Sequence, residues 1–257
     1  MTKDCPPEFV DLAHRLANAA GDVIRPYFRQ KIDIIGKTDN SPVTIADRDS
    51  ETAMRNLIEA TFPNHGIIGE EHGNVRTDSE FVWVLDPIDG TLSFISGSPT
   101  FGSLIALTRN GVPILGVLDQ PISGERWVGA NGLSTLNDTP ISTRQCENLS
   151  DATLFAWGAE LLEGSHEQRF RRLYNAIKRK RFGYDCYAYG LLALGFVDIV
   201  ADCDMKPFDY CALVPIVENA GGMITDWAGN PLTLSNPGYV LAAGNPGLHQ
   251  QALEILA

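Results

Sequence analysis

The chain has 257 residues, 44% of them hydrophobic, and a formal net charge of −12. This length and apolar content are sufficient for a substantial core, which predicts a globular fold. The acidic balance excludes broad binding to nucleic acid, whose phosphate backbone attracts basic surfaces.

We expect neither a membrane span, nor a secretory signal, nor a disulfide framework in this chain. No apolar run approaches the roughly 18 residues of a membrane span, and the first residues lack the apolar stretch of a secretory signal. We therefore expect a cytoplasmic protein that does not bind membranes. Five scattered cysteines without a C-x-x-C pair indicate neither a disulfide framework nor a structural zinc site.

The N-terminal half, about residues 1–145, predicts two helices followed by a sheet. Apolar residues recur at every third or fourth position over 9–29, which is typical of an amphipathic helix, and a second helix is expected over 46–62. Short apolar runs bounded by turn residues predict strands over 67–68, 82–85, 101–108, 114–118 and 126–129. Several of these strands should be antiparallel, because their connections are too short for a crossover helix.

After about residue 150 the pattern changes to alternating strands and helices. Strands are predicted over 153–157, 197–201, 223–226 and 239–243, and helices over 166–178, 187–194 and 210–219. The basic run 178–181 is interpreted as the solvated continuation of a helix. Because no repeat or linker is visible, we expect the halves 1–145 and 150–257 to form one domain of layered α and β elements.

The most informative segment is 83–91, an apolar strand-like run that ends in Asp86 and Asp89 and then turns sharply. These carboxylates and a backbone carbonyl between them suit a hard divalent cation such as Mg²⁺. Gly90 lets the backbone approach a ligand, and a helix starting near Thr91 would direct its free N–H groups toward an anion. Taken alone, the same residues also suit a solvated turn.

A phosphate-transfer site built on metal ions needs carboxylates from several segments, because one turn cannot surround two cations. Glu70 follows a predicted strand, Asp47 begins the second predicted helix, and Asp209 opens a later one. The alternatives are capping and dipole roles for Asp47 and Asp209, and a surface position for Glu70.

Taken together, Gly-Glu-Glu at 69–71, Asp-Pro-Ile-Asp-Gly-Thr at 86–91, and Asp209 ahead of Glu-Asn-Ala-Gly-Gly at 218–222 resemble the inositol monophosphatase family of Mg²⁺-dependent phosphatases. The segment 41–47 belongs to the same pattern, and Lys37 lies near the position of a family lysine. The resemblance implies an α/β fold of αβαβα layers, two or three Mg²⁺ ions, and a homodimer.

The resemblance also implies roles for individual residues. The implied metal ligands are Glu70, Asp86, the Ile88 carbonyl, Asp89 and Asp209. Asp47 and Thr91 would help orient the attacking water, which Glu70 and Thr91 would contact. The backbone N–H groups after Asp89, at Gly90 and Thr91, would hold the phosphate.

Segments 183–190 and 206–210 look like the histidinol-phosphate phosphatase branch of that family, and 93–97 and 125–127 point the same way. Histidinol phosphate carries an ammonium group and an imidazole, so a pocket for it should present carboxylates beyond the metal ligands. Asp185 and Asp202 are the candidates, beside Asp209. The chain departs from that branch at Leu92, Tyr184 and Asp202, where Lys or Arg, Gly, and Glu are usual.

These features predict a Mg²⁺-dependent phosphomonoesterase that hydrolyses L-histidinol phosphate in histidine biosynthesis. An inositol-1-phosphate or broader sugar-phosphate phosphatase is the alternative, because neutral polyols also form hydrogen bonds with carboxylates. A regulatory binding protein without turnover is a further alternative, although every candidate metal carboxylate is present. A nucleotide phosphatase is one more alternative, although the sequence shows no basic or aromatic nucleotide pocket.

Overall fold

The computed structural model describes residues 4–31, 35–36, 42–158, 161, 163–164 and 166–256. The N-terminal half contains α1 (Pro7–Ile24), the 3₁₀ turn η1 (Arg25–Tyr27), β1 (Ile35–Gly36), β2 (Pro42–Val43), α2 (Ile45–Thr61), β3 (Gly66–Gly69), β4 (Phe81–Asp89), α3 (Thr91–Ile95), β5 (Gly102–Arg109), β6 (Val112–Gln120), β7 (Glu125–Ala130), β8 (Leu133–Leu136) and β9 (Thr139–Pro140). The C-terminal half contains the 3₁₀ turn η2 (Leu149–Asp151), β10 (Thr153–Ala156), α4 (Glu167–Ala176), β11 (Arg179–Phe182), α5 (Tyr187–Ala193), β12 (Ile199–Asp202), α6 (Pro207–Tyr210), α7 (Leu213–Asn219), β13 (Met223–Thr225), β14 (Val240–Ala243) and α8 (Pro246–Leu256).

A seven-stranded sheet forms the centre of the N-terminal half, in the order β3-β4-β5-β6-β7-β8-β9. β3 and β4 are parallel, and the other neighbours are antiparallel. Both faces are covered, which explains the nearly continuous apolar runs of its central strands. On β4, Trp83 packs into the core shared with α1 and α2, whereas Val84 packs into the core on the opposite face.

A five-stranded sheet forms the C-terminal half, in the order β11-β10-β12-β14-β13. The first three strands are parallel to one another, and β14 is antiparallel to both of its neighbours. One face shares a core with α5 and α7, and the other shares a core with α4 and α8.

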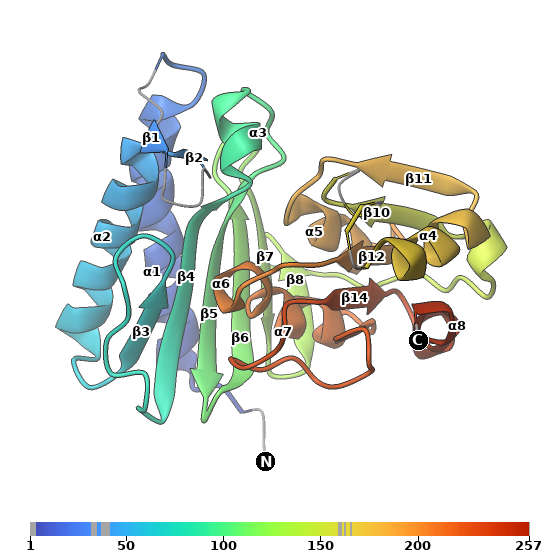
Figure 1. The fold of residues 1–257 in the computed structure, drawn as a ribbon. Coiled ribbons are helices and arrows are strands. Elements are labelled where there is room, and N and C mark those ends of the chain that lie inside the picture. Colours follow the sequence, from blue (N-terminus) through green and yellow to red (C-terminus); the bar gives the residue numbers. More distant parts are fainter. Residues whose placement is uncertain are drawn as a thin grey trace.

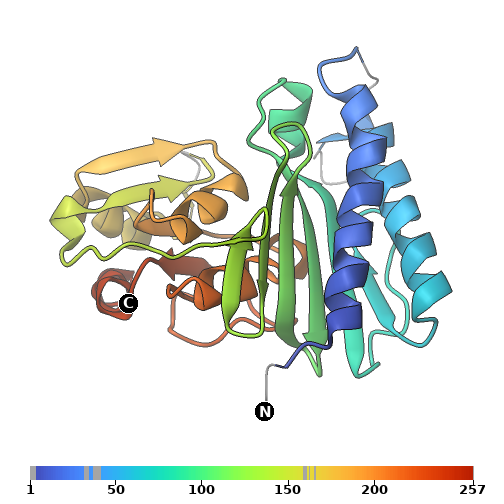
Figure 2. The ribbon, with the colours of Figure 1, turned by 180° about the vertical axis from the view of Figure 1, so that it is seen from behind.

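The layers therefore follow the order α, β, α, β, α (Figure 1). Seen from behind, α1 and α2 lie along the outer face of the seven-stranded sheet, while α8 lies at the opposite end of the molecule (Figure 2). The layered αβαβα fold expected from the sequence is confirmed. Among the described helices, none combines the length and apolar character needed to span a bilayer.

Several element predictions are wrong in detail. The first helix ends at Ile24 and gives way to η1, because Pro26 cannot continue the α-helical hydrogen bonding. The basic run 178–181 lies mostly in β11, an edge strand parallel to β10, and not on a helix. Charged side chains suit an edge strand, since they discourage pairing with another chain.

The helix predicted over 210–219 is two helices, α6 and α7. Pro215 lies in the first turn of α7, where its missing N–H costs no hydrogen bond. α8 was not predicted, although Leu248, Ala252 and Leu256 recur at helical spacing and are buried.

Candidate active site

The end of β4 brings Asp86 and Asp89 together. In a regular strand, residues three apart point to opposite faces. Here the register against β5 shifts between Asp86 and Asp89, so that their partners on β5 are two residues apart. This bulge re-aims the side chains, and the Ile88 N–H donates to Asp86 Oδ1 at 3.0 Å.

Asp209 reaches the same point from α6. Carboxylate oxygens of Asp86, Asp89 and Asp209 lie within 4.8 Å of one another. The Cys186 N–H donates to Asp89 Oδ2 at 2.7 Å, and the Lys206 N–H donates to Asp209 Oδ2 at 2.6 Å. Each of these hydrogen bonds uses one oxygen of its carboxylate, so other lone pairs of the carboxylates remain available to bind a cation.

The electrostatics of this cluster favour a bound cation. Burial raises the pKa of Asp86 well above its usual value, and neighbouring carboxylates, first that of Glu70, raise it further. Burial, followed by the negative charge of Asp209, raises the pKa of Asp89 well above its usual value. Burial also raises the pKa of Asp209, to about 7. Buried carboxylates that oppose one another's ionisation are typical of hard-metal sites, and an all-oxygen ligand set fits Mg²⁺.

Glu70 is held next to this cluster by a turn that α2 supports. Its carboxylate is close enough for its charge to raise the pKa of Asp86 and Asp209. The buried Glu51 of α2 accepts the Glu71 N–H at 2.7 Å and the His72 N–H at 3.2 Å, which fixes the turn after β3. Glu51 was not identified from the sequence, although it is a charged residue on the apolar face of a predicted helix.

Asp47 lies at the start of α2 and serves two neighbours. The Thr44 N–H and hydroxyl donate to Asp47 Oδ2 at 2.8 and 2.5 Å, which completes a capping box. The Thr91 hydroxyl lies 3.4 Å from Asp47 Oδ1 and 3.2 Å from the Ile88 carbonyl oxygen. The Asp47 carboxylate therefore both caps α2 and contacts Thr91. It is buried, and burial raises its pKa.

Gly90 and Asp185 are in close contact. Gly90 has φ +82°, and a Cβ at this position would lie 2.6 Å from Asp185 Cγ, so only glycine fits without displacement. Asp185 Oδ2 accepts the hydroxyls of Ser93 at 2.5 Å and Thr100 at 3.1 Å. Burial raises the pKa of Asp185, and these two hydroxyls oppose the shift.

Asp202 ends β12 and is 4% exposed. Its Oδ1 accepts the Trp157 N–H at 2.8 Å, and its Oδ2 accepts the Tyr189 hydroxyl at 2.7 Å. Burial raises its pKa to about 6. Both oxygens therefore have protein donors, although each retains a second lone pair.

Two neighbouring cavities surround these residues. The first, of about 340 Å³, is lined by ten residues: Asp89, Trp157, Asp185, Cys186, Tyr189, Asp202, Cys203, Asp204, Met205 and Asp209. The second, of about 500 Å³, is lined by Glu70, Gly90, Thr91, Leu92, Ser93, Trp157, Gly158, Phe182, Gly183 and Asp185. Every residue predicted to bind substrate lines at least one of them, and Asp185 and Trp157 line both.

The residues that depart from the expected branch lie at or near these cavities. Leu92 lines the larger cavity and is 68% exposed, so an apolar side chain stands at its mouth. The Tyr184 ring packs on Phe155 with 4.5 Å between centroids. Lys37 lies outside the described residues.

A sequence model described as the inositol monophosphatase family matches residues 7–257. This chain belongs to the inositol monophosphatase family. Members of this family are metal-dependent phosphatases, and this chain is a phosphatase of the family. The resemblance inferred from the three motif blocks is therefore confirmed.

Similar proteins within the family carry several names. The chain is 50% identical over 258 residues to the bifunctional phosphatase IMPL2, chloroplastic, of Arabidopsis thaliana, covering 96% of this chain and 75% of that protein. It is 35% identical to a histidinol-phosphatase of Chlorobaculum parvum, with 91% of each covered. A solved inositol monophosphatase from Zymomonas mobilis is 46% identical and superposes with a TM-score of 0.89, covering 97% of both chains.

Proposed function

We propose that this family member is a Mg²⁺-dependent phosphomonoesterase that hydrolyses L-histidinol phosphate to L-histidinol and phosphate, a step of histidine biosynthesis. The observation that carries the proposal is the convergence of Asp86, Asp89 and Asp209, whose oxygens lie within 4.8 Å of one another. Their cluster adjoins a cavity that Asp185 and Asp202 also line. The carboxylates of Asp86, Asp89 and Asp209 suit metal ions, and those of Asp185 and Asp202 suit the ammonium group of the substrate.

Glu70, Asp86, the Ile88 carbonyl, Asp89 and Asp209 would hold two or three Mg²⁺ ions. Such ions, when bound, make water more acidic and neutralise charge on the phosphate and the leaving oxygen. This role accounts for the buried carboxylates, which would otherwise oppose one another's ionisation.

The protein's own groups would position the reactants. The Thr91 hydroxyl, held between Asp47 and the Ile88 carbonyl, would orient the attacking water together with Glu70. The backbone turns at Gly90 with φ +82°, and the N–H groups of Gly90 and Thr91 would hold the phosphate. Asp209, which lines the smaller cavity, would contact the substrate there.

Asp185 and Asp202 would bind the ammonium and imidazole groups. The name of the Chlorobaculum parvum relative supports this substrate, and the two carboxylates supply the charge that it requires. Inositol-1-phosphate or a broader set of sugar phosphates is the second candidate, favoured by the name of the Zymomonas mobilis structure. A non-catalytic regulatory role is less favoured, because the carboxylate cluster is complete.

We further propose that the enzyme is a cytoplasmic homodimer acting on a small phosphate ester, and not on nucleic acid or membranes. The net charge of −12 supports the exclusion of nucleic acid. Since the Arabidopsis thaliana relative is named chloroplastic, fractionation of the source cells tests the compartment. Light scattering of the purified chain tests the dimer.

Phosphate release tests the activity. Histidinol phosphate, inositol monophosphate and a nucleoside monophosphate would be compared with Mg²⁺, without it, and with EDTA. We expect Mg²⁺-dependent release that is fastest from histidinol phosphate. Preference for another ester would support the metal-dependent mechanism and reject histidinol phosphate as the substrate. No release of phosphate from any ester would favour a regulatory protein without turnover.

A further inference from the structure

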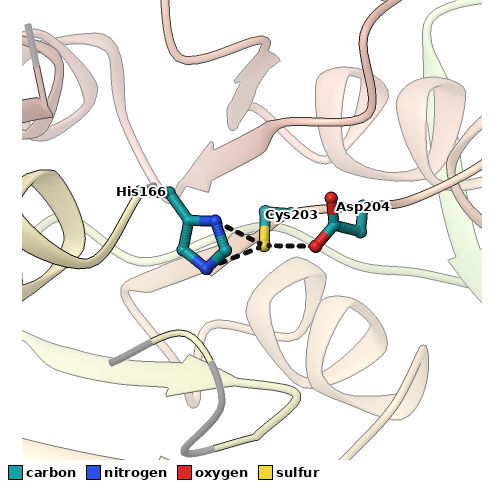
Figure 3. Close-up of side chains that lie close together, drawn as sticks. All are labelled: His166, Cys203 and Asp204. Carbon is teal, nitrogen blue, oxygen red and sulfur yellow. Dashed lines mark hydrogen bonds between the residues drawn. The ribbon is translucent and has the colours of Figure 1, made fainter. Parts of the chain in front are cut away.

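A second group of metal-ligating side chains lies at the edge of the 340 Å³ cavity, apart from the carboxylate cluster. It consists of His166, Cys203 and Asp204, whose ligand atoms lie within 4.8 Å of one another. Figure 3 shows the His166 ring and the Asp204 carboxylate approaching the Cys203 sulfur from either side. We propose that these three residues form a binding site for Zn²⁺ or a similar borderline-soft cation, distinct from the proposed Mg²⁺ centre.

The separations of the ligand atoms match a zinc site. Cys203 Sγ lies 3.5 Å from His166 Nε2 and 3.3 Å from Asp204 Oδ2. With Zn–S of about 2.3 Å and Zn–N of about 2.0–2.1 Å, tetrahedral geometry places neighbouring ligand atoms roughly 3.5 Å apart. Cys203 Sγ is also 3.7 Å from His166 Nδ1, so the imidazole ring must turn to direct one nitrogen lone pair at a cation held by Cys203 and Asp204. The fourth position of that cation remains open for water.

The chemistry of the three ligands separates this site from the carboxylate centre. Thiolate and imidazole favour Zn²⁺, whereas a site made only of oxygen atoms favours Mg²⁺. Burial, with Asp204 next, raises the pKa of the Cys203 thiol to about 12, so the metal-free thiol keeps its proton at neutral pH. Binding would release that proton to solvent and leave a thiolate on the metal.

The surrounding fold holds the three ligands in place. Cys203 follows directly after β12 and is 4% exposed, and Asp204 adopts φ +60°, which turns the chain back beside the sulfur. His166 precedes α4, and its ring stands edge-on to Trp227 and Tyr239 at 6.4 Å between centroids. Packed aromatic rings limit the orientations available to the imidazole.

Occupation of the site would change the charge of the cavity that the two sites share. Zn²⁺ brings two positive charges and displaces the Cys203 thiol proton, so its binding makes this end of the cavity more positive by one charge. Resting on the proposed function, this means that bound Zn²⁺ raises the KM for histidinol phosphate, whose alcohol part carries an ammonium group, about threefold or more, with less effect on inositol monophosphate, whose alcohol part is uncharged. The site would then couple substrate affinity to metal supply.

Cobalt binding tests the site without relying on activity. Co²⁺ is titrated into the full-length, reduced protein in saturating Mg²⁺, which keeps the carboxylate centre filled. We expect a near-ultraviolet thiolate-to-cobalt band that saturates at one equivalent and is displaced by Zn²⁺. Cys203→Ser should abolish the band, and Cys146→Ser, a matched change at a cysteine outside the cavity lining, should retain it.

His166→Gln and Asp204→Asn keep the test decisive if the buried Cys203→Ser variant does not fold. Each should weaken cobalt affinity by about 100-fold or more, since even residues that only support metal ligands account for about 10- to 100-fold. Absence of the band in the wild type, or unchanged affinity in both of these variants, would overturn the zinc site. Neither outcome depends on which phosphate ester the protein hydrolyses.

Discussion

At the scale of single residues, the carboxylates of the candidate active site have different surroundings and so different expected roles. Asp86, Asp89 and Asp209 face one another, and burial raises the pKa of each. Burial also raises the pKa of Asp185 and Asp202, but the hydroxyls of Ser93, Thr100 and Tyr189 donate to them and oppose that shift. The first group therefore suits a metal ion, whereas the second is held in place by hydroxyl donors of the protein.

Asp89→Asn should abolish Mg²⁺-dependent phosphate release while leaving the fold intact. The substitution removes a charge that Asp209 opposes, and the amide oxygen can still accept the Cys186 N–H. Magnesium at 100 times its Kd should stabilise the wild type by about 2.7 kcal/mol and raise its Tm by about 5–10 °C. Melting curves with and without Mg²⁺ should show that most of this shift is lost in the variant. Full activity in Asp89→Asn would contradict the metal assignment.

Asp185→Asn should mainly alter substrate selection. An amide cannot neutralise an ammonium group, so the KM for histidinol phosphate should rise about tenfold while that for inositol monophosphate changes little. Steady-state kinetics with both esters provide the measurement, with substitution of the exposed Asp138, Asp138→Asn, as the control. Equal losses on both esters would count against a selective role for Asp185.

At the scale of the elements, one close approach of two backbone segments decides how the layers pack. α7 lies directly on the seven-stranded sheet, and a Cβ on Gly116 of β6 would lie 1.9 Å from the Ala212 carbonyl oxygen. Backbone atoms cannot move aside as a flexible side chain can. Glycine at this position therefore sets the distance between the sheet and the helix layer that carries Asp209.

Gly116→Ala should lower the free energy of unfolding by about 1–3 kcal/mol, the usual cost of overpacking. Gly247→Ala is the matched control, because a Cβ there would meet only Asn245 Oδ1 at an ordinary 3.4 Å. Gly247 lies in the first turn of α8, so the control should be neutral or stabilising by up to about 1 kcal/mol. Urea unfolding of both variants measures the difference, and equal effects would exclude a packing origin.

His249 of α8 should make this C-terminal layer sensitive to acid. Burial lowers its pKa from 6.5 to about 4, and its Nε2 lies 2.9 Å from the Thr225 hydroxyl. Because the pKa of His249 is lower in the folded protein, the unfolded chain binds more protons than the folded protein between pH 4 and pH 6.5. Stability should therefore be full above pH 6.5 and fall as the pH drops toward 4, by about 2 kcal/mol at pH 5.

The comparison of wild type with His249→Gln isolates this contribution. The buried carboxylates have raised pKa values and act in the opposite direction, so the pH profile of the wild type alone is a sum of both effects. The difference in unfolding free energy between the two proteins should narrow as the pH falls from 6.5 to 4. A constant difference over that range would contradict the assignment.

At the scale of the whole molecule, the two sheets share one core. Val84 and Leu104 of the seven-stranded sheet belong to the same buried cluster as Val200 and Ala242 of the five-stranded sheet. We propose that the halves 1–145 and 150–257 fold as one domain. Calorimetry in EDTA should give a single transition with equal calorimetric and van't Hoff enthalpies, and two separate transitions would reject the proposal.

Much of the fold followed from local pattern because apolar periodicity reports which face of an element is buried. α2 and the central strands lie within a few residues of their predicted bounds. β11 was misread because an edge strand need not carry an apolar run, and α8 was missed although its apolar spacing is helical. In both cases the element is defined by its neighbours in the C-terminal sheet and not by its own sequence alone.

The sequence by itself determined the family and the candidate ligands, because residues 86–91 place two carboxylates and a glycine turn within one short segment. Only the tertiary structure decided how they are used. The bulge in β4 aims Asp86 and Asp89 at Asp209, Glu51 supports the turn that carries Glu70, and His166 meets Cys203 across 37 positions of sequence. These contacts depend on the packing of elements that are distant in the sequence, which a local pattern of residues does not encode.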